Sequence, residues 1–85
     1  MFFYIYVLET KGGVQKYTGY TSNLKKRLEE HQKGFVFSTK SKLPVRLIYY
    51  EACLSETDAK RREKYLKTTG GRRFLSKRLK EYLFA

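Results

Sequence analysis

Three stretches of the chain carry hydrophobic side chains in the pattern of β-strands. Residues 2–9 (FFYIYVLE) are almost continuously aromatic or β-branched, which is typical of a central strand covered on both faces. Residues 16–21 (KYTGYT) follow a turn marked by Gly12 and Gly13, so the first two strands are expected to form an antiparallel hairpin. Residues 45–52 (VRLIYYEA) form the third predicted strand.

A first helix is predicted after the hairpin. It begins with a cap at Ser22 or Asn23 and ends at the next glycine along the chain. Leu24, Leu28 and His31 recur at helical spacing and therefore share one stripe. That stripe is expected to cover one face of the sheet.

Two more helices complete the predicted fold. One opens at Ser55, carries acidic residues in its first turn and is expected to stop near Gly70 and Gly71. The last occupies residues 72–85. Its predicted inward side chains are Phe74, Leu75, Leu79 and Leu83. The chain of 85 residues is thus predicted to be a single α+β domain, residues 1–85, in which helices flank a small three-stranded antiparallel sheet.

The charge of +11 changes this picture by indicating a polyanionic partner. Residues 1–58 hold nine basic and six acidic side chains, whereas residues 59–80 hold ten basic and one acidic. This imbalance favours a nucleic-acid surface over the alternative, an ordinary solvated helix face. The predicted nucleic-acid-binding side chains are Lys26, Lys60, Arg61, Lys64, Lys67, Arg72 and Arg73.

Other classes of protein are disfavoured. No apolar run approaches the roughly 20 residues that span a bilayer, and the opening MFFYIYVL lacks the basic start and cleavage site of a signal peptide. No membrane partner is therefore expected. The single cysteine, Cys53, excludes an internal disulfide and a cysteine-based metal site, which favours a cytoplasmic location.

Three groups of side chains are candidates for chemistry. Arg27 and His31 lie one turn apart on the same helix face, where one could hold a phosphate and the other move a proton; an ordinary surface pair is the alternative. Tyr6 and Tyr17 could meet across the hairpin, either as core residues or to position an attacking water.

Glu63 is the only acid between residues 59 and 80. A helical wheel places it near the inward side, in line with Ala59 and close to Leu66. Its carboxylate could hold one Mg²⁺ ion together with water and a substrate phosphate, or it could form an ion pair with a neighbouring lysine. The other acids form no cluster in the sequence, which argues against a two-metal site.

Taken together, these residues resemble the motifs of the GIY-YIG nuclease family, and most closely its small stand-alone members related to the N-terminal nuclease module of the bacterial excision-repair C subunit. YIY at residues 4–6 and YTG at residues 17–19 correspond to the two name-giving motifs. Arg27, His31 and Glu63 follow in the family's order.

The resemblance implies a metal-dependent DNA endonuclease with one Mg²⁺ or Mn²⁺ ion. It implies that either motif tyrosine, Tyr6 or Tyr17, activates water and that Gly19 closes the second motif. Arg27 would bind the scissile phosphate, His31 would assist proton movement and Glu63 would hold the ion; the residues so implied to be catalytic are Tyr6, Tyr17, Arg27, His31 and Glu63.

Two departures from the motifs are Tyr4 in place of glycine and Thr18 in place of isoleucine. Without an appended DNA-binding domain, target choice would depend on the basic face or on a partner protein. DNA, damaged or branched, is the expected substrate, with RNA as a second possibility. The alternatives are a non-catalytic DNA- or RNA-binding module on the same scaffold and a module that binds an acidic protein.

Overall fold

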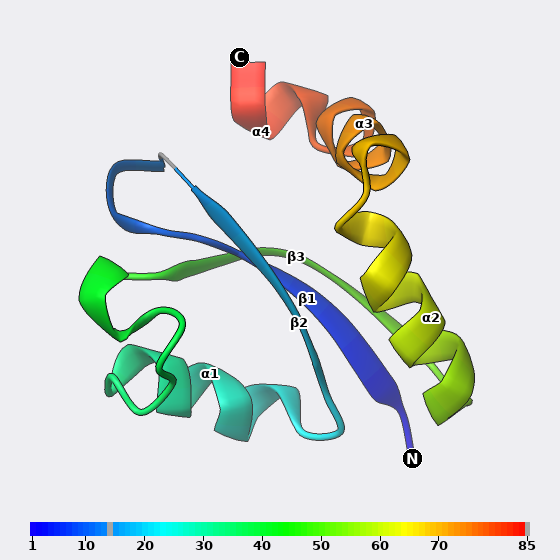
Figure 1. The fold of residues 1–85 in the computed structure, drawn as a ribbon, viewed down its shortest axis with the longest axis horizontal. Helices are drawn as coiled ribbons and strands as arrows, with labels where there is room; N and C mark the ends of the chain where they lie inside the picture. Colours follow the sequence, from blue (N-terminus) through cyan, green and yellow to red (C-terminus); the bar gives the residue numbers. More distant parts are fainter. Residues whose placement is uncertain (14, 85) are drawn as a thin grey trace.

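The computed structural model describes residues 1–13 and 15–84 (Figure 1). Its strands are β1 (Phe3–Glu9), β2 (Lys16–Thr21) and β3 (Arg46–Cys53), and its α-helices are α1 (Leu24–Gln32), α2 (Glu56–Leu66), α3 (Thr69–Arg78) and α4 (Lys80–Phe84). Short 3₁₀ turns occupy Lys11–Gly13 and Lys40–Lys42. The predicted α+β class is confirmed. No helix in the described ranges combines the length and apolarity that crossing a membrane requires.

The sheet has the order β2-β1-β3, and both neighbouring pairs are antiparallel. The central strand β1 is buried from Ile5 to Leu8, as its continuous hydrophobic pattern predicted. In the register, Tyr6 lies opposite Gly19 of β2 and Tyr50 of β3. Because β2 and β3 are the edges of the sheet, each has one side that no other strand of the sheet covers.

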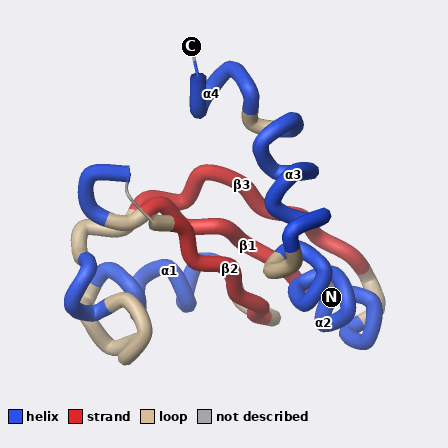
Figure 2. The backbone as a smooth tube through the Cα atoms, turned by 45° about the horizontal axis from the view of Figure 1, so that its top comes forward, coloured by secondary structure: helices blue, strands red, loops and turns tan. Residues whose placement is uncertain are grey.

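Helices cover the two faces of the sheet separately. Alternate residues of β1 point to opposite faces, so Tyr6 and Leu8 pack with Leu24 and Leu28 of α1, while Val7 packs under α2 and α3. Figure 1 shows α1 and α2 on opposite sides of the sheet. In Figure 2, α3 and α4 continue from α2 on the side away from α1. The molecule therefore has three layers, with the sheet in the middle.

The predicted starts of the first two helices are confirmed, and the predicted end of the second is wrong. Asn23 caps α1 and Ser55 caps α2 through their side-chain oxygens. The second helix ends at Leu66, before the two glycines, because the Thr68 hydroxyl accepts the Gly71 N–H and starts α3 there. The glycines lie in the first turn of α3, where a Cβ on Gly71 would collide with the backbone of α2.

The single last helix predicted over residues 72–85 is also corrected. The structure has α3 beginning at Thr69 and a break at Leu79, followed by the short α4. After the break, the Tyr82 hydroxyl donates to Glu9 Oε1 at 2.7 Å, and the Arg46 guanidinium lies 5.7 Å from the Tyr82 ring centroid. These contacts with the sheet give a tertiary reason for the bend, which the helical pattern alone does not contain.

Candidate active site

Four of the residues predicted to be catalytic lie together on the α1 side of the sheet. The ring centroids of Tyr6 and Tyr17 are 6.2 Å apart, and the His31 ring lies 5.6 Å from the first and 5.1 Å from the second. The guanidinium of Arg27 interacts with both phenols. We call Tyr6, Tyr17, Arg27 and His31 the α1-side cluster.

The register of the hairpin creates this cluster. Tyr17 lies opposite Leu8, two residues along β1 from Tyr6, so the two phenols are diagonal neighbours on the same face. On α1, Arg27 and His31 are four residues apart and therefore project one turn apart toward these rings. Residues far apart in the sequence thus reach one place through one strand pairing and one helix.

Gly19 makes room for Tyr6. The two residues are direct partners in the sheet, and the Tyr6 ring lies across the glycine. A Cβ at position 19 would collide with the Tyr6 hydroxyl, and it would be 2.5 Å from Cζ and 2.9 Å from Cε1. This is the close approach that a glycine inside a strand predicted.

Replacing Gly19 with alanine should therefore overpack the site. The Tyr6 side chain is only 1% exposed, so its ring has no free space to move into. We expect Gly19→Ala to lower the free energy of unfolding by about 1–3 kcal/mol in urea titrations. Gly70→Ala is the control, because its Cβ would meet no atom closer than 3.5 Å and should be tolerated. Equal stability of the two variants would contradict the tight packing of Tyr6 on Gly19.

His31 is fully buried and hydrogen-bonded at both ring nitrogens. Nε2 lies 2.9 Å from the Tyr6 hydroxyl, and Nδ1 lies 2.8 Å from Thr39 Oγ1. Burial lowers the pKa of His31, and the positive charge of Arg27 lowers it further. The imidazole is therefore neutral at pH 7, and a proton that it exchanges with the site must pass through Tyr6.

The lowered pKa of His31 predicts acid sensitivity. Below about pH 6.5, its ordinary value, the unfolded chain binds a proton that the folded protein does not bind. Stability should therefore be fully present above this pH and fall as the pH drops toward the folded pKa. The charged and titratable groups that face the imidazole are Tyr6 on β1, Tyr17 on β2, and Arg27 and Glu30 on α1.

Urea unfolding of the wild type and of His31→Gln between about pH 5 and 8 checks this expectation. Only the wild type should lose stability steeply across the upper part of this range. Glu51 and Glu56, whose pKa values are lowered from 4.5, lose their contributions at more acidic pH in both proteins. Parallel stability curves for the two proteins would show that His31 does not titrate as described.

The hydroxyl of Tyr6 is a poor base. Burial raises its pKa to about 12, although the neighbouring Arg27 acts in the opposite direction. Hydrogen bonding to Tyr6 holds the pKa of Arg27 above its ordinary value. At neutral pH the site therefore presents a protonated phenol and a permanent cation, an arrangement that binds an anion.

Sequence reasoning missed two neighbours of the cluster. Glu30 accepts a hydrogen bond from Arg27 Nη1 at 3.1 Å. The i,i+3 spacing of these two residues in the sequence could have predicted this ion pair. Thr39 lies in a polar loop whose sequence has no periodicity, so nothing local pointed to its contact with His31.

Two hollows flank β2. The one on the α1 side measures about 510 Å³, and its lining includes Lys26, Arg27 and Glu30. The other measures about 760 Å³, lies between β2 and the helices α2–α4, and includes Tyr17 among its lining residues. Its cationic lining residues are Lys16, Lys67 and Arg72. Both faces of the β2 edge thus carry positive charge beside candidate site residues.

Glu63 belongs to the other layer of the molecule. Together with Glu56, Lys60 and Lys67 it forms a stripe along α2 at three- and four-residue spacing. The Tyr20 hydroxyl of β2 donates to Glu56 Oε2 at 2.6 Å, and Lys60 Nζ lies 5.4 Å from the Tyr20 ring centroid. This α2 stripe therefore faces β2 from the side opposite α1.

The structure does not bring Glu63 into contact with the α1-side cluster. Its Oε2 accepts from Lys67 Nζ at 2.9 Å, the ion pair that was the alternative to a metal ligand. In the described part of the chain, no hydrogen bond or ion pair joins it to the four clustered residues. Its side chain is 22% exposed, compared with 53% for Glu56 on the same stripe.

The single carboxylate of Glu63 suits a cation that takes its other ligands from water and from the substrate phosphate. The described residues contain no group of three His, Cys, Asp or Glu side chains that could hold a metal ion. Mg²⁺ nevertheless keeps several waters and is commonly held by one or two carboxylates plus substrate phosphates. A single carboxylate that pairs with one lysine is consistent with this mode and not with an all-protein cage.

The seven predicted nucleic-acid-binding side chains are all exposed. Three of them form ion pairs with acids of α2, namely Lys60, Arg61 and Lys67. Across the described residues, those that form no ion pair are Lys26, Lys64, Arg72 and Arg73. The unpaired cations have charge available for phosphates.

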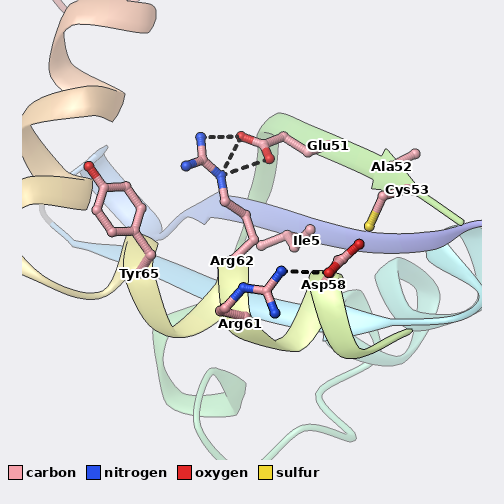
Figure 3. A pocket seen from close by; sticks show the side chains of 8 residues that line it. All are labelled: Ile5, Glu51, Ala52, Cys53, Asp58, Arg61, Arg62 and Tyr65. Atoms are coloured by element: carbon pink, nitrogen blue, oxygen red, sulfur yellow. Dashed lines mark hydrogen bonds and ion pairs between the residues drawn. The ribbon is translucent and has the colours of Figure 1, made fainter. Parts of the chain in front are cut away.

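Arg61 lies on the far side of α2 from β2. Together with Arg62 it lines a hollow of about 470 Å³ beside β3 (Figure 3). Arg62 Nε and Nη2 donate to the Glu51 carboxylate at 3.0 Å, and Arg61 Nη2 donates to Asp58 Oδ1 at 2.5 Å. Because both guanidinium groups are neutralised there, the β2 side offers the more available positive charge.

Comparison with known proteins finds the family described as GIY-YIG catalytic domain, which matches residues 2–82. A UPF0213 protein of Streptococcus agalactiae serotype V is 46% identical over 66 residues, which are 75% of this chain and 73% of that protein. A UPF0213 protein of Clostridium perfringens is 38% identical over 65 residues, 75% of this chain and 69% of that one. The solution NMR structure of a UPF0213 protein from Bacillus halodurans is 37% identical and matches with a TM-score of 0.49, covering 98% of this chain and 82% of that one.

Proposed function

Because the chain belongs to the GIY-YIG catalytic domain family, whose activity is of the nuclease type, we propose that it is a divalent-metal-dependent endonuclease that hydrolyses phosphodiester bonds in DNA. The observation that supports this most is the gathering of two phenols, a guanidinium and a buried imidazole in the α1-side cluster. The basic surface on both sides of β2 supports a nucleic-acid substrate.

Arg27 is the group that receives the scissile phosphate. Its guanidinium is already bonded to the Glu30 carboxylate, at 3.1 Å, so its geometry suits an anionic oxygen. A phosphate oxygen takes the place of this carboxylate when the substrate binds. The guanidinium then stabilises the negative charge that grows on the phosphate as water attacks.

The two tyrosines have different tasks. Tyr6, buried and held protonated by its raised pKa, donates a hydrogen bond and does not accept the water proton. Tyr17 is half-buried on the edge strand β2, whereas Tyr6 is 1% exposed on the central strand, so water reaches Tyr17 more easily. Tyr17 therefore positions or activates the attacking water.

Glu63 would hold one Mg²⁺ or Mn²⁺ ion that it shares with the substrate. When bound, such an ion polarises the phosphodiester and stabilises the departing oxygen. Glu63 lies on the α2 stripe that faces β2, and its Oε2 is 2.9 Å from Lys67 Nζ. A cytoplasmic role in DNA repair or recombination, with a partner protein for targeting, completes the proposal, and the free thiol of Cys53 is consistent with this location.

A tyrosine pair tests the proposal. Purified protein is incubated with nicked, flapped, branched and single-stranded DNA, and with RNA, in Mg²⁺ or Mn²⁺. We expect Tyr17→Phe to reduce cleavage about a hundredfold, because a general base or water-positioning group contributes of that order. Tyr4→Phe is the matched control, since Tyr4 packs edge-on against Tyr50, outside the α1-side cluster. Equal losses in both variants, or none in either, would contradict the role of Tyr17.

A further inference from the structure

Two of the most exposed hydrophobic side chains in the described structure lie in one loop. This loop, residues 33–45, connects α1 to β3, and in Figures 1 and 2 it lies beside α1. Phe35 and Phe37 are 72% and 79% exposed, whereas Val36 between them is 7% exposed. Single exposed apolar side chains are common on proteins, but two phenyl groups this close in the chain are a candidate binding surface.

Hydrogen bonds hold the backbone of the 33–45 loop in place. The Phe35 N–H donates to Glu30 O at 2.9 Å, and the Thr39 N–H donates to Val36 O at 3.1 Å. The Thr39 hydroxyl also lies 2.8 Å from His31 Nδ1, which joins the loop to the α1-side cluster. A loop fixed in this way loses little conformational freedom when it binds, so its exposed rings form a preorganised surface.

The 33–45 loop is also basic. Residues 31–50 contain Lys33, Lys40, Lys42 and Arg46 and no acidic residue. All three lysines are exposed, and none of them forms an ion pair with a described residue. Lys40 Nζ lies 5.0 Å from the Phe37 ring centroid, so positive charge borders the aromatic surface. Two copies of such a loop would repel each other, whereas a polyanion would be attracted to it.

Exposed aromatic rings beside cations are the combination that binds single-stranded nucleic acid. The cations contact phosphates, and bases of any identity stack on the rings because every base has a π-face. In a duplex the bases are already paired and stacked on one another, and exposing one of them costs energy. The chemistry of the 33–45 loop therefore favours an unpaired strand over an intact duplex.

We propose that Phe35 and Phe37 form a stacking site for unpaired bases of the substrate. Lys33, Lys40 and Lys42 contact the phosphates on either side of the stacked bases. This inference rests on the proposed function, from which it takes the nucleic-acid substrate, and it narrows the substrate class to strands with unpaired nucleotides. Because the loop is bonded to the α1-side cluster, an unpaired segment that stacks there lies beside the site of cleavage.

A pair of oligonucleotides with the same phosphate charge isolates the stacking. One is a single strand of DNA, and the other has the same length but carries abasic units in place of several bases. Binding of the full chain is measured by fluorescence anisotropy in EDTA, so that no cleavage is needed. The wild type should bind the strand with bases about tenfold more tightly, within the range that stacking on an aromatic side chain contributes.

Substitutions assign this preference to the loop. The double variant Phe35→Ala/Phe37→Ala should bind both oligonucleotides equally, whereas Phe37→Tyr keeps the ring and should keep the preference. Phe84→Ala is the matched control, because Phe84 is also 72% exposed but lies on α4, on the other side of the sheet. A wild type without the preference, a double variant that retains it, or an equal loss in Phe84→Ala would overturn the proposal.

Two other occupants of the loop are tested with the same proteins. A wild-type dimer that the double substitution dissociates in sedimentation would assign the phenyl groups to a second copy of the chain and overturn the proposal. Binding to phosphatidylserine vesicles that depends on both phenyl groups, without a preference for bases, would overturn it in favour of a membrane. A wild type that prefers bases but cuts nothing would refute the nuclease proposal alone, and one that cuts DNA without this preference would refute the stacking site alone.

Discussion

Arg27→Ala should lower the rate of phosphodiester cleavage about a thousandfold while leaving the fold intact. The guanidinium is the one permanent cation in the α1-side cluster, and it interacts with both phenols. Its removal leaves the growing charge on the phosphate without this donor. The loss should appear in the rate constant for cleavage measured under single-turnover conditions, and the circular dichroism spectrum should be unchanged.

Binding should separate from cleavage in the same variant. The proposal gives most phosphate contacts to the exposed cations along α2 and α3, so we expect Arg27→Ala to weaken DNA affinity only a few-fold. Lys26→Ala is the matched control, because Lys26 is the neighbouring exposed cation and should reduce binding slightly and kcat hardly at all. Loss of affinity in proportion to loss of cleavage in Arg27→Ala would show that Arg27 is merely one phosphate contact among many.

Glu63→Gln should lower metal-dependent cleavage about a hundredfold or more, because a metal ion contributes several kcal/mol to the stabilisation of such a transition state. The substitution keeps the shape and removes the charge. Glu56→Gln is the control. Glu56 lies on the same α2 stripe and forms an equivalent i,i+4 ion pair with Lys60, at 3.7 Å, but its carboxylate also accepts a hydrogen bond from the Tyr20 hydroxyl.

The dependence of cleavage on metal concentration tests whether Glu63 holds the ion. Raising Mg²⁺ or Mn²⁺ should partly rescue a variant whose ion affinity is weakened, and Lys67→Ala, which frees the carboxylate, should require less metal than the wild type. If Glu56→Gln and Glu63→Gln cleave equally well at every metal concentration, Glu63 is only the ion-pair partner of Lys67 and does not hold a metal ion.

The strands and the side chains that share a face of one element followed from local pattern, whereas the family resemblance was what joined Tyr6, Tyr17, Arg27 and His31 in one site. The continuous apolar run in β1 predicted a central strand, which is confirmed. The spacing of Leu24, Leu28 and His31 predicted a shared stripe on α1, and the structure buries its histidine fully. The glycine inside β2 predicted that another group lies close to the backbone there, and the Tyr6 ring is that group. On α1, the periodicity of 3.6 residues determined which side chains share a face.

Long-range packing was not contained in the same patterns. The wheel correctly placed Glu63 near the inward side of its helix, yet no local rule states which face of the sheet that helix covers. The two glycines after α2 looked like a helix end, and they instead permit the backbone of α3 to touch α2. Thr39 met His31 only because the loop folds back, a contact between residues with no shared periodicity.

The central claim is that this α1-side cluster cuts nucleic acid and does not merely bind it. Wild type and Arg27→Ala are compared on one labelled DNA panel, with cleavage and equilibrium binding measured in the same Mg²⁺ buffer over a range of salt. We predict cleavage by the wild type, and binding without cleavage by Arg27→Ala. A wild type that binds every substrate with a steep salt dependence, yet cuts none in Mg²⁺ or Mn²⁺, would contradict the nuclease and leave a binding module.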